Sequence, residues 1–249
     1  MRIAVCLSGQ PRGLPFSLDL FKWGLLDKND NIDIFIHSWF NKSIVGNKFD
    51  SAQPENFNAT GTAAENTESL LKSICPKGIL LESPKDFNEF SHLKDLGTAR
   101  QKSLASMFYS SFKSNELKRK YEEDNKFTYD LVIKTRIDLQ YSKQVVLSDL
   151  PISKIQTDLF VPQKHHHTRV SDSYPTKTGF NYSSMSDTWI LGSSQNIDIA
   201  ASVFCRFEEI YNDIYPYAYG EAYLGYVVRG LGKIPISMID VDYNIYRPR

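Results

Sequence analysis

The sequence predicts an α/β fold in which a mixed, mostly parallel central sheet is flanked by helices. Short apolar runs, such as Ile3 to Leu7 and Leu131 to Ile133, are typical of strands buried on both faces of such a sheet. Between these runs, apolar residues recur at helical spacing, most clearly over residues 98–124. This βα alternation, without internal repeats or low-complexity linkers, favours a single domain over residues 1–249.

The composition argues against several classes of function. Hydrophobic residues make up 41% of the 249 residues and charged residues 23%, which is typical of a globular protein with a full core. Lys plus Arg and Asp plus Glu both number 29, so no global basic field attracts nucleic acid or acidic lipid. We therefore expect a small ligand that is bound at a local site.

The three cysteines, Cys6, Cys75 and Cys205, occur in unrelated contexts and predict neither a disulfide framework nor a zinc site. Cys6 and Cys205 lie within apolar patterns, so we expect both to be reduced core residues. No run reaches membrane-spanning length, and the apolar segment at the start is too short for a signal peptide. We expect a cytoplasmic protein, with peripheral membrane contact near Arg247 left open.

The first strand runs directly into the turn Ser8–Gly13, and residues with helical spacing follow this turn. Backbone N–H groups of such a loop, together with Arg12, can hold a phosphate. The spacing matches neither a P-loop nor the Gly-x-Gly-x-x-Gly fingerprint. A phosphate-binding loop and a plain βα turn therefore stay equally open.

A second strand is predicted over Ile32–Trp39, and His37 near its exit is either a structural group or part of a pocket wall. Residues 42–62 read as a long surface loop, a type that often serves as a lid or binding loop. The capping-box pattern Thr62-x-x-Glu65 predicts the start of the next helix, and Gly78–Leu81 predicts a third strand.

The most secure helix starts at the pattern Thr98-x-x-Gln101 and leads into the next strand. Its inner stripe is expected to be core packing, and it consists of Leu104, Met107, Phe108 and Phe112. The segment from Lys118 to Asp124 is predicted to be a charged tail.

The stretch 129–139 is predicted to be a central strand. After its apolar run, strict alternation puts Lys134, Arg136 and Asp138 on one face. In open α/β sheets, ligands bind outside the carboxyl ends of the strands. Arg136 and Asp138 are therefore candidate site residues, and a purely structural ion pair is the alternative.

The second half is less regular. Leu159–Pro162 and Ser186–Gly192 read as strands, the second entered by the acidic residue Asp187, and a very polar segment separates them. That segment contains three consecutive histidines, of which only His165 and His167 could face one metal, because neighbours on an extended backbone point to opposite sides. A solvated loop is the favoured interpretation.

Asn196 is predicted to cap a helix that reaches Tyr211, and a last strand is predicted over Ile234–Val241. Between them lies a helix on which Glu221 precedes Leu224 by one turn, on the inward face near the positive end of the helix dipole. Glu221 can cap this helix or act as a general base, and both roles stay open.

Together these parts suit group transfer from an activated phosphate ester. A hard divalent cation is a usual counter-charge for a diphosphate, and Asp138 can give Mn²⁺ or Mg²⁺ a carboxylate. Arg136 can donate a forked pair of hydrogen bonds to phosphate oxygens. Glu221 or Asp187 can take the proton of an incoming hydroxyl group.

At these residues the chain resembles GT-A-type nucleotide-sugar glycosyltransferases, in particular bacterial and viral ones linked to surface polysaccharide synthesis. The resemblance covers Ile3–Gly13, Asp33–Trp39, Ser103–Ser110, Tyr129–Leu139 and Ser186–Gly192. It implies one GT-A-like domain, with a nucleotide-binding half over residues 1–140 and an acceptor-binding half over residues 141–249. The nucleotide contacts that it implies come from Ser8, Gly9, Gln10, Arg12 and His37.

In that fold an Asp-x-Asp motif ends a central strand and binds the metal-diphosphate, and Arg136-Ile137-Asp138 resembles it here. Because Arg replaces the first Asp, only Asp138 carries over as a metal ligand, and Arg136 takes part of the charge neutralisation. Gly220-Glu221 resembles the site of the base in inverting members, and Asp187 matches a region that contacts the acceptor sugar. The resemblance implies sugar transfer from a nucleotide-diphosphate sugar to a hydroxyl of a glycan or other acceptor.

Two other functions stay open. A sugar-phosphate nucleotidyltransferase would share the first strand, loop and helix, but it needs a longer glycine-rich loop with a catalytic Lys or Arg, which Arg12 matches only in part. A nucleotide-sugar-binding domain without catalysis is the other alternative, and Arg136 in place of an acidic residue favours it.

Overall fold

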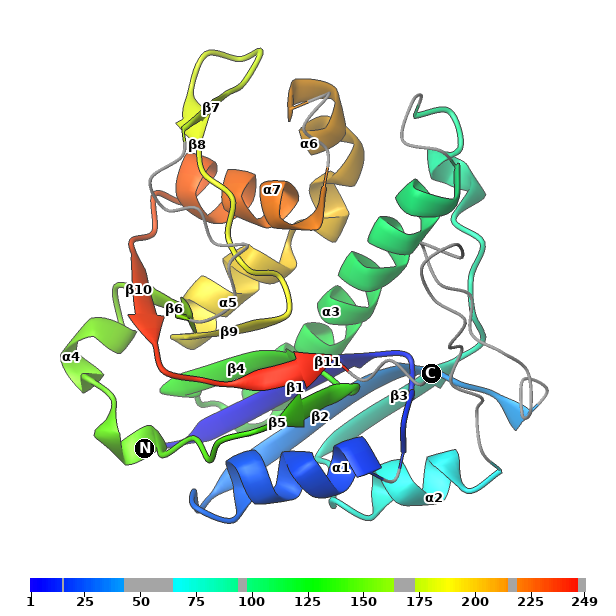
Figure 1. Ribbon diagram of the computed structural model, residues 1–249, viewed down its shortest axis with the longest axis vertical. Coiled ribbons are helices and arrows are strands. Elements are labelled where there is room, and N and C mark those ends of the chain that lie inside the picture. The colour runs from blue at the N-terminus through cyan, green and yellow to red at the C-terminus, as the bar shows by residue number, and fades with distance from the viewer. Residues whose placement is uncertain (15, 43–64, 94–97, 164–172, 215–218, 246–249) are drawn as a thin grey trace.

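The computed structural model describes residues 1–14, 16–42, 65–93, 98–163, 173–214 and 219–245, with the backbone alone at 98–101 and 152. A seven-stranded sheet lies at its centre, in the order β10-β6-β9-β4-β1-β2-β3 (Figure 1). Its strands are β1 (Ile3–Gly9), β2 (Ile32–Trp39), β3 (Gly78–Glu82), β4 (Leu131–Arg136), β6 (Leu159–Pro162), β9 (Trp189–Gly192) and β10 (Ile236–Ile239). Only β9 runs antiparallel to its neighbours within this sheet. The prediction of a mixed, mostly parallel sheet is confirmed.

Helices lie on both sides of the sheet (Figure 1). One side carries α3 (Thr98–Asn125), α5 (Ser194–Ala201), α6 (Phe207–Ile214) and α7 (Gly220–Gly225). The other side carries α1 (Phe16–Phe21), α2 (Thr67–Lys72) and the antiparallel pair of β5 (Leu139–Tyr141) and β11 (Tyr243–Ile245). The shorter elements are α4 (Ile152–Ile155), the hairpin of β7 (Tyr174–Pro175) and β8 (Asn181–Tyr182), π-helical turns at Lys22–Leu26 and Tyr226–Leu231, and 3₁₀ turns at Asn88–Phe90, Leu147–Asp149 and Phe204–Arg206.

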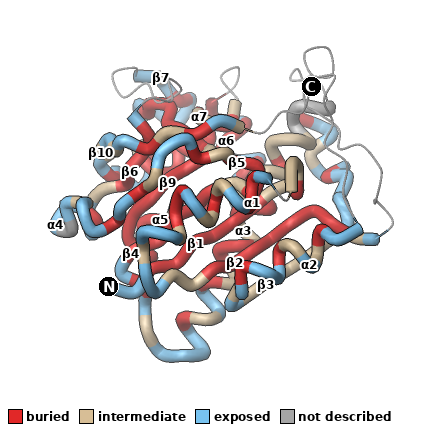
Figure 2. The backbone as a smooth tube through the Cα atoms, turned by 60° about the horizontal axis from the view of Figure 1, so that its bottom comes forward, coloured by how far each residue is buried: buried red, intermediate tan, exposed pale blue. Residues whose placement is uncertain are grey.

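The first strand shows why its sequence is apolar throughout. Ala4 and Cys6 point into the core on the α3 side, whereas Ile3, Val5 and Leu7 point into the core on the α1 side. Figure 2 shows that buried residues dominate the sheet, and both β1 and β4 lie inside it. A strand with helices on both faces has no polar face, so its run of apolar residues is continuous rather than alternating.

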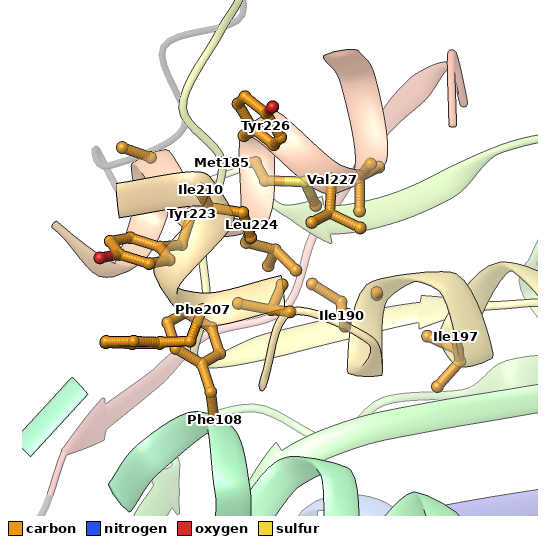
Figure 3. Close-up of a cluster of buried hydrophobic side chains, with 14 of the residues drawn as sticks. Phe108, Met185, Ile190, Ile197, Phe207, Ile210, Tyr223, Leu224, Tyr226 and Val227 are labelled. Atoms are coloured by element: carbon orange, nitrogen blue, oxygen red, sulfur yellow. The ribbon is translucent and has the colours of Figure 1, made fainter. Parts of the chain in front are cut away.

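The core on the α3 side joins the first and second halves of the chain. Phe108 of α3 lies under Phe207 of α6 and Tyr223 of α7, with ring centroids 6.4 and 5.7 Å from that of Phe108 (Figure 3). Leu104 and Met107 pack against the same core, which confirms this part of the predicted inner stripe, whereas Phe112 is partly exposed and contacts Phe204. The contacts of Phe108 fix α7, which carries Glu221, above the sheet.

Several helix boundaries differ from the prediction. The helix expected from Asn196 to Tyr211 is split into α5, a 3₁₀ turn and α6, and its N-cap is Ser193, whose side chain accepts the N–H of Asn196. The sequence pattern does not show this split, because the apolar residues of α5 and α6 pack into the same core. The helical periodicity of apolar residues therefore continues across the break between the two helices. The capping-box prediction was also wrong. α2 begins at Thr67 after an N-cap Asn66 that makes no side-chain cap hydrogen bond.

Two predicted environments were wrong. Lys118, expected in a charged tail, is fully buried on the sheet side of α3, where its ammonium group meets Glu122 and Asp198. Cys205, expected in the core, is exposed, whereas Cys6 is buried, and all three cysteines are free. The expected loop over residues 42–62 and the histidines 165–167 lie outside the described residues. No described helix is long and apolar enough to cross a membrane.

Candidate functional site

The strand order reverses between β1 and β4. From β1 the sheet continues to β2 and β3 on one side and to β4 on the other. In open α/β sheets ligands bind outside the carboxyl ends of the strands at such a reversal. Ser8 near the end of β1 lies opposite Arg136, the last residue of β4. The topology therefore brings the loop that follows Ser8 next to Arg136.

The loop after β1 is held by its own polar groups. Gly9 has a φ of 119°, in the left-handed range that favours glycine, and nothing lies within 4 Å of a Cβ added there. The Arg12 guanidinium donates to Oε1 of Gln10, and the Arg12 N–H donates to the Gln10 carbonyl at 2.8 Å. The Gly13 carbonyl accepts the N–H of Ser17 in the next helix. The predicted strand, loop and helix are confirmed.

A buried relay of hydrogen bonds lies behind this loop. The N–H of Gly9 donates to Oγ of Ser110 on α3 at 2.8 Å, and this oxygen lies 2.7 Å from Nδ1 of His37. Nε2 of His37 in turn lies 2.9 Å from the Glu82 carboxylate. Because an ionised carboxylate can only accept, Nε2 carries the proton, and Nδ1 accepts the Ser110 hydroxyl.

The charge states of the relay agree with this assignment. Burial lowers the pKa of His37 to about 4, so its ring is neutral near pH 7. Although burial opposes the shift, hydrogen bonds from Lys85, His37 and Tyr109 lower the pKa of Glu82 to about 2. The His37 side chain is fully buried, and its hydrogen-bonded link to Gly9 of the loop runs through Ser110. Its predicted contact with a nucleotide stays a prediction.

Arg136 and Asp138 form one rigid pair. Nε and Nη2 of Arg136 donate to the two carboxylate oxygens of Asp138 at 2.8 and 2.7 Å. Asp138 is not on the strand as predicted, because β4 ends at Arg136 and Asp138 lies in the turn before β5. The Asp138 side chain is 3% exposed and that of Arg136 is 25% exposed. Burial opposes ionisation, but the Asp138 carboxylate raises the pKa of Arg136 above its usual value.

This pairing does not fit the divalent cation that the resemblance implies. Both oxygens of Asp138 already accept hydrogen bonds from Arg136, and the carboxylate is almost fully buried. A metal ion would have to displace the guanidinium, whose charge also repels it. Within the described residues, no group of three or more His, Cys, Asp or Glu side chains is placed to hold a metal. The Mn²⁺ or Mg²⁺ site stays a prediction, without support from the geometry of Asp138.

Asp187 joins the same region from the segment before β9. Its carbonyl accepts a hydrogen bond from the ammonium group of Lys134, which lies two residues before Arg136 on β4. Its carboxylate packs against the backbone of Gly220, where a Cβ would overlap it. Burial lowers the pKa of Lys134 to about 8, although the Asp187 charge opposes this shift.

Glu221 is the second residue of α7, directly after Gly220, and it is partly exposed. The N-cap of α7 is Tyr219, which makes no side-chain cap hydrogen bond, and Glu221 lies two residues further on, in the first turn. The Glu221 carbonyl accepts the N–H of Met185 at 3.1 Å, which ties α7 to the segment before β9. The Asp187 carboxylate therefore lies at the start of α7, against the residue before Glu221.

The structure thus brings most predicted site residues to one edge of the sheet. Strand register joins Ser8 to Arg136, and a side-chain contact joins Asp187 to Gly220 at the start of α7. The sequence did not single out Ser110 or Lys134 as site residues. The alternation of β4 already put Lys134 on the face of Arg136, whereas the partnership of Ser110 with Gly9 spans 101 residues and leaves no local signal.

Comparisons with known proteins do not assign the chain. No protein-family model matches it, and no curated protein is significantly similar to it in sequence.

Proposed function

We propose that this protein is a glycosyltransferase with a GT-A-like domain. It transfers a sugar from a nucleotide-diphosphate sugar to a hydroxyl group of a glycan or another acceptor. The residues around Arg136 and the loop 8–13 bind the donor, and the start of α7 faces the acceptor. Surface polysaccharide synthesis is the proposed setting and the cytoplasm the proposed location.

One observation carries this proposal. At the point where the strand order reverses, the Arg136 side chain is partly exposed and lies beside the loop that begins at Ser8. A guanidinium in this position offers forked donors to phosphate oxygens, and loop backbone N–H groups can add to them. Charged side chains on a central strand are rare unless they have a partner or a task, and Arg136 has both a partner and an exposed edge.

The acidic pair supplies the base in this proposal. Asp187 and Glu221 lie at the start of α7, so a hydroxyl group bound there meets a carboxylate. The acceptor oxygen attacks the anomeric carbon and gives its proton to the carboxylate. The bond from that carbon to the diphosphate oxygen breaks, and the nucleoside diphosphate leaves with the electron pair. Glu221 is the proposed base because it is more exposed than Asp187.

A nucleotide-sugar-binding domain without catalysis is the second candidate. The closed Arg136–Asp138 pair favours it, because an expected metal ligand is occupied by an internal partner. Turnover separates the two candidates. A sugar-phosphate nucleotidyltransferase would instead release pyrophosphate when it is given a nucleoside triphosphate and a sugar phosphate, which a separate assay with these substrates detects.

The test starts with thermal shifts on a panel of nucleoside diphosphates and continues with hydrolysis or transfer of the matching nucleotide sugar. We expect Glu221→Gln to keep nucleotide binding and to lower turnover by about 10²-fold or more, as for a lost general base. Glu123→Gln, on the exposed side of α3, is the matched control. If no nucleotide sugar is turned over although the diphosphate binds, the binding-domain candidate replaces the transferase.

A further inference from the structure

We propose that the donor diphosphate is bound by the guanidinium of Arg136, which Asp138 holds in place, and that this binding needs no divalent cation. The inference rests on the proposed function and specifies how its donor site works. Asp138 is then a positioning residue for Arg136 rather than a metal ligand.

The geometry of the pair supports this assignment. A guanidinium has N–H donors on more than one edge, and Asp138 takes one edge with two parallel hydrogen bonds of 2.8 and 2.7 Å. Those two bonds are the only hydrogen bonds of the Arg136 side chain to the part of the chain that the structure describes. The side chain is nevertheless 25% exposed, and the proposal places the diphosphate at its remaining donors.

The hydrogen bonds to Asp138 also reduce the side-chain entropy that Arg136 loses when a ligand binds. A long, flexible arginine side chain loses rotamer freedom when it is fixed. Here the carboxylate has already fixed the plane of the guanidinium, and Asp138 is itself buried in the turn before β5. A diphosphate that arrives at the other edge therefore meets a preorganised fork.

The neighbouring charges favour an anion over a cation at the exposed edge. Lys134 lies on the same face of β4 as Arg136, and Arg12 lies in the loop that begins opposite Arg136. Against these three cations stand Asp138, whose oxygens face Arg136, and Asp187, whose carboxylate packs on Gly220 and helps to raise the pKa of Arg136. The outer edge of Arg136 is thus a positive group with its counter-ion behind it. A metal ion there would meet the guanidinium before it reached a carboxylate.

Isothermal calorimetry on the full chain in EDTA tests the inference, with inorganic pyrophosphate, UDP, GDP and the free nucleosides as probes. We expect pyrophosphate and one of the diphosphates to bind in EDTA, with no gain in affinity when Mn²⁺ is added. The double variant Arg136→Gln/Asp138→Asn removes the pair without leaving a buried unpaired charge. It should lose about tenfold or more in diphosphate affinity and bind the nucleoside as before.

Two further variants make the result specific. Arg136→Lys keeps the charge but lacks the fork, so it should fold and bind the diphosphate with an intermediate affinity. Arg206→Gln removes an exposed arginine that pairs with Glu209 and should leave binding unchanged. A loss of affinity for nucleoside and diphosphate alike would show a general structural defect and overturn the assigned role of Arg136.

The remaining outcomes separate this inference from the proposed function. One outcome is that a nucleoside diphosphate binds only with Mn²⁺, and that the single variant Asp138→Asn either loses this binding or no longer needs Mn²⁺ for it. In that case the metal-independent role of Arg136 is wrong and the proposed glycosyltransferase function stands. If neither pyrophosphate nor any nucleoside diphosphate binds with or without Mn²⁺, the donor site fails, and both proposals fail with it.

Discussion

Two clusters of buried charge lie at opposite edges of the central sheet, and they differ in how fully their donors are used. At the amino edge, the ammonium group of Lys118 donates to Ser194 and lies 2.9 Å from Asp198 and 3.1 Å from Glu122. Glu122 also accepts the N–H of Tyr129, just before β4 begins. An ammonium group has three donors, and this one has three partners.

The cluster at the carboxyl edge is not closed in this way. Arg136 gives two of its donors to Asp138 and keeps part of its surface exposed, although the chain around it is otherwise buried. A closed cluster joins α3 to α5 and holds the fold together, whereas a cluster with remaining donors suits a ligand. The burial of charge alone therefore does not mark a functional site, and the unused donors distinguish the two clusters.

The largest effect on stability is expected from breaking the closed cluster. Lys118→Met leaves the mostly buried Glu122 without its cation, which should lower the free energy of unfolding by about 3 kcal/mol. Urea denaturation measures this loss, and Lys120→Met on the exposed face of the same helix is the control. Nucleotide affinity of the folded Lys118→Met protein should stay unchanged. An affinity loss as large as that of the Arg136 variants would end the distinction between the clusters.

A smaller effect should appear with pH at the carboxyl edge. Burial lowers the pKa of Lys134 from 10.5 to about 8 in the folded protein. Between these values the unfolded chain binds more protons, so the folded state gains stability as the pH rises. This net shift, in which the Asp187 charge opposes burial and the Arg136 charge adds to it, limits the whole gain to about 3 kcal/mol.

Tyrosine ionisation in the unfolded chain acts in the opposite direction above about pH 10, so the comparison needs a variant. Relative to the Lys134→Met variant, the wild type should gain unfolding free energy as the pH rises from about 7 to about 10. Urea titrations across this range measure it. Parallel curves for the two proteins would show that Lys134 is not held in the predicted environment.

The sequence predicted the sheet better than its surroundings. The runs that form β1, β2 and β4 are apolar because both faces of these strands are buried, and this signal is local. By contrast, β11 was missed because it is short and pairs with β5, with Tyr243 opposite Tyr141. Its pairing partner is distant in the sequence, so no periodic pattern marks it as a strand.

The candidate site shows the same limit. Alternation placed Arg136 and Asp138 on one face of a strand, and the two side chains do meet, although a turn brings them together. It could not show that each oxygen of Asp138 is bound by Arg136, because that depends on the geometry of the turn. Nor could it show the support of Gly9 by Ser110, which requires α3 to lie across the end of β1.

The smallest expected effect concerns this support. Ser110→Ala leaves the Gly9 N–H without its acceptor and His37 without its donor, which should lower the free energy of unfolding by about 1–2 kcal/mol. Because Gly9 then loses the contact that fixes its φ, we also expect weaker diphosphate binding, by less than about tenfold.

Ser114→Ala is the matched control, because this hydroxyl is equally buried one turn further along α3 and bonds only to the Ser111 carbonyl of its own helix, at 2.9 Å. Calorimetry with the best nucleoside diphosphate and urea denaturation should separate the two variants, with a loss of affinity in Ser110→Ala alone. Equal affinities in both variants would mean that the relay stabilises the fold without shaping the loop. The carboxyl edge would then depend on the Arg136–Asp138 pair, and the contrast with the Lys118 cluster would rest on that pair.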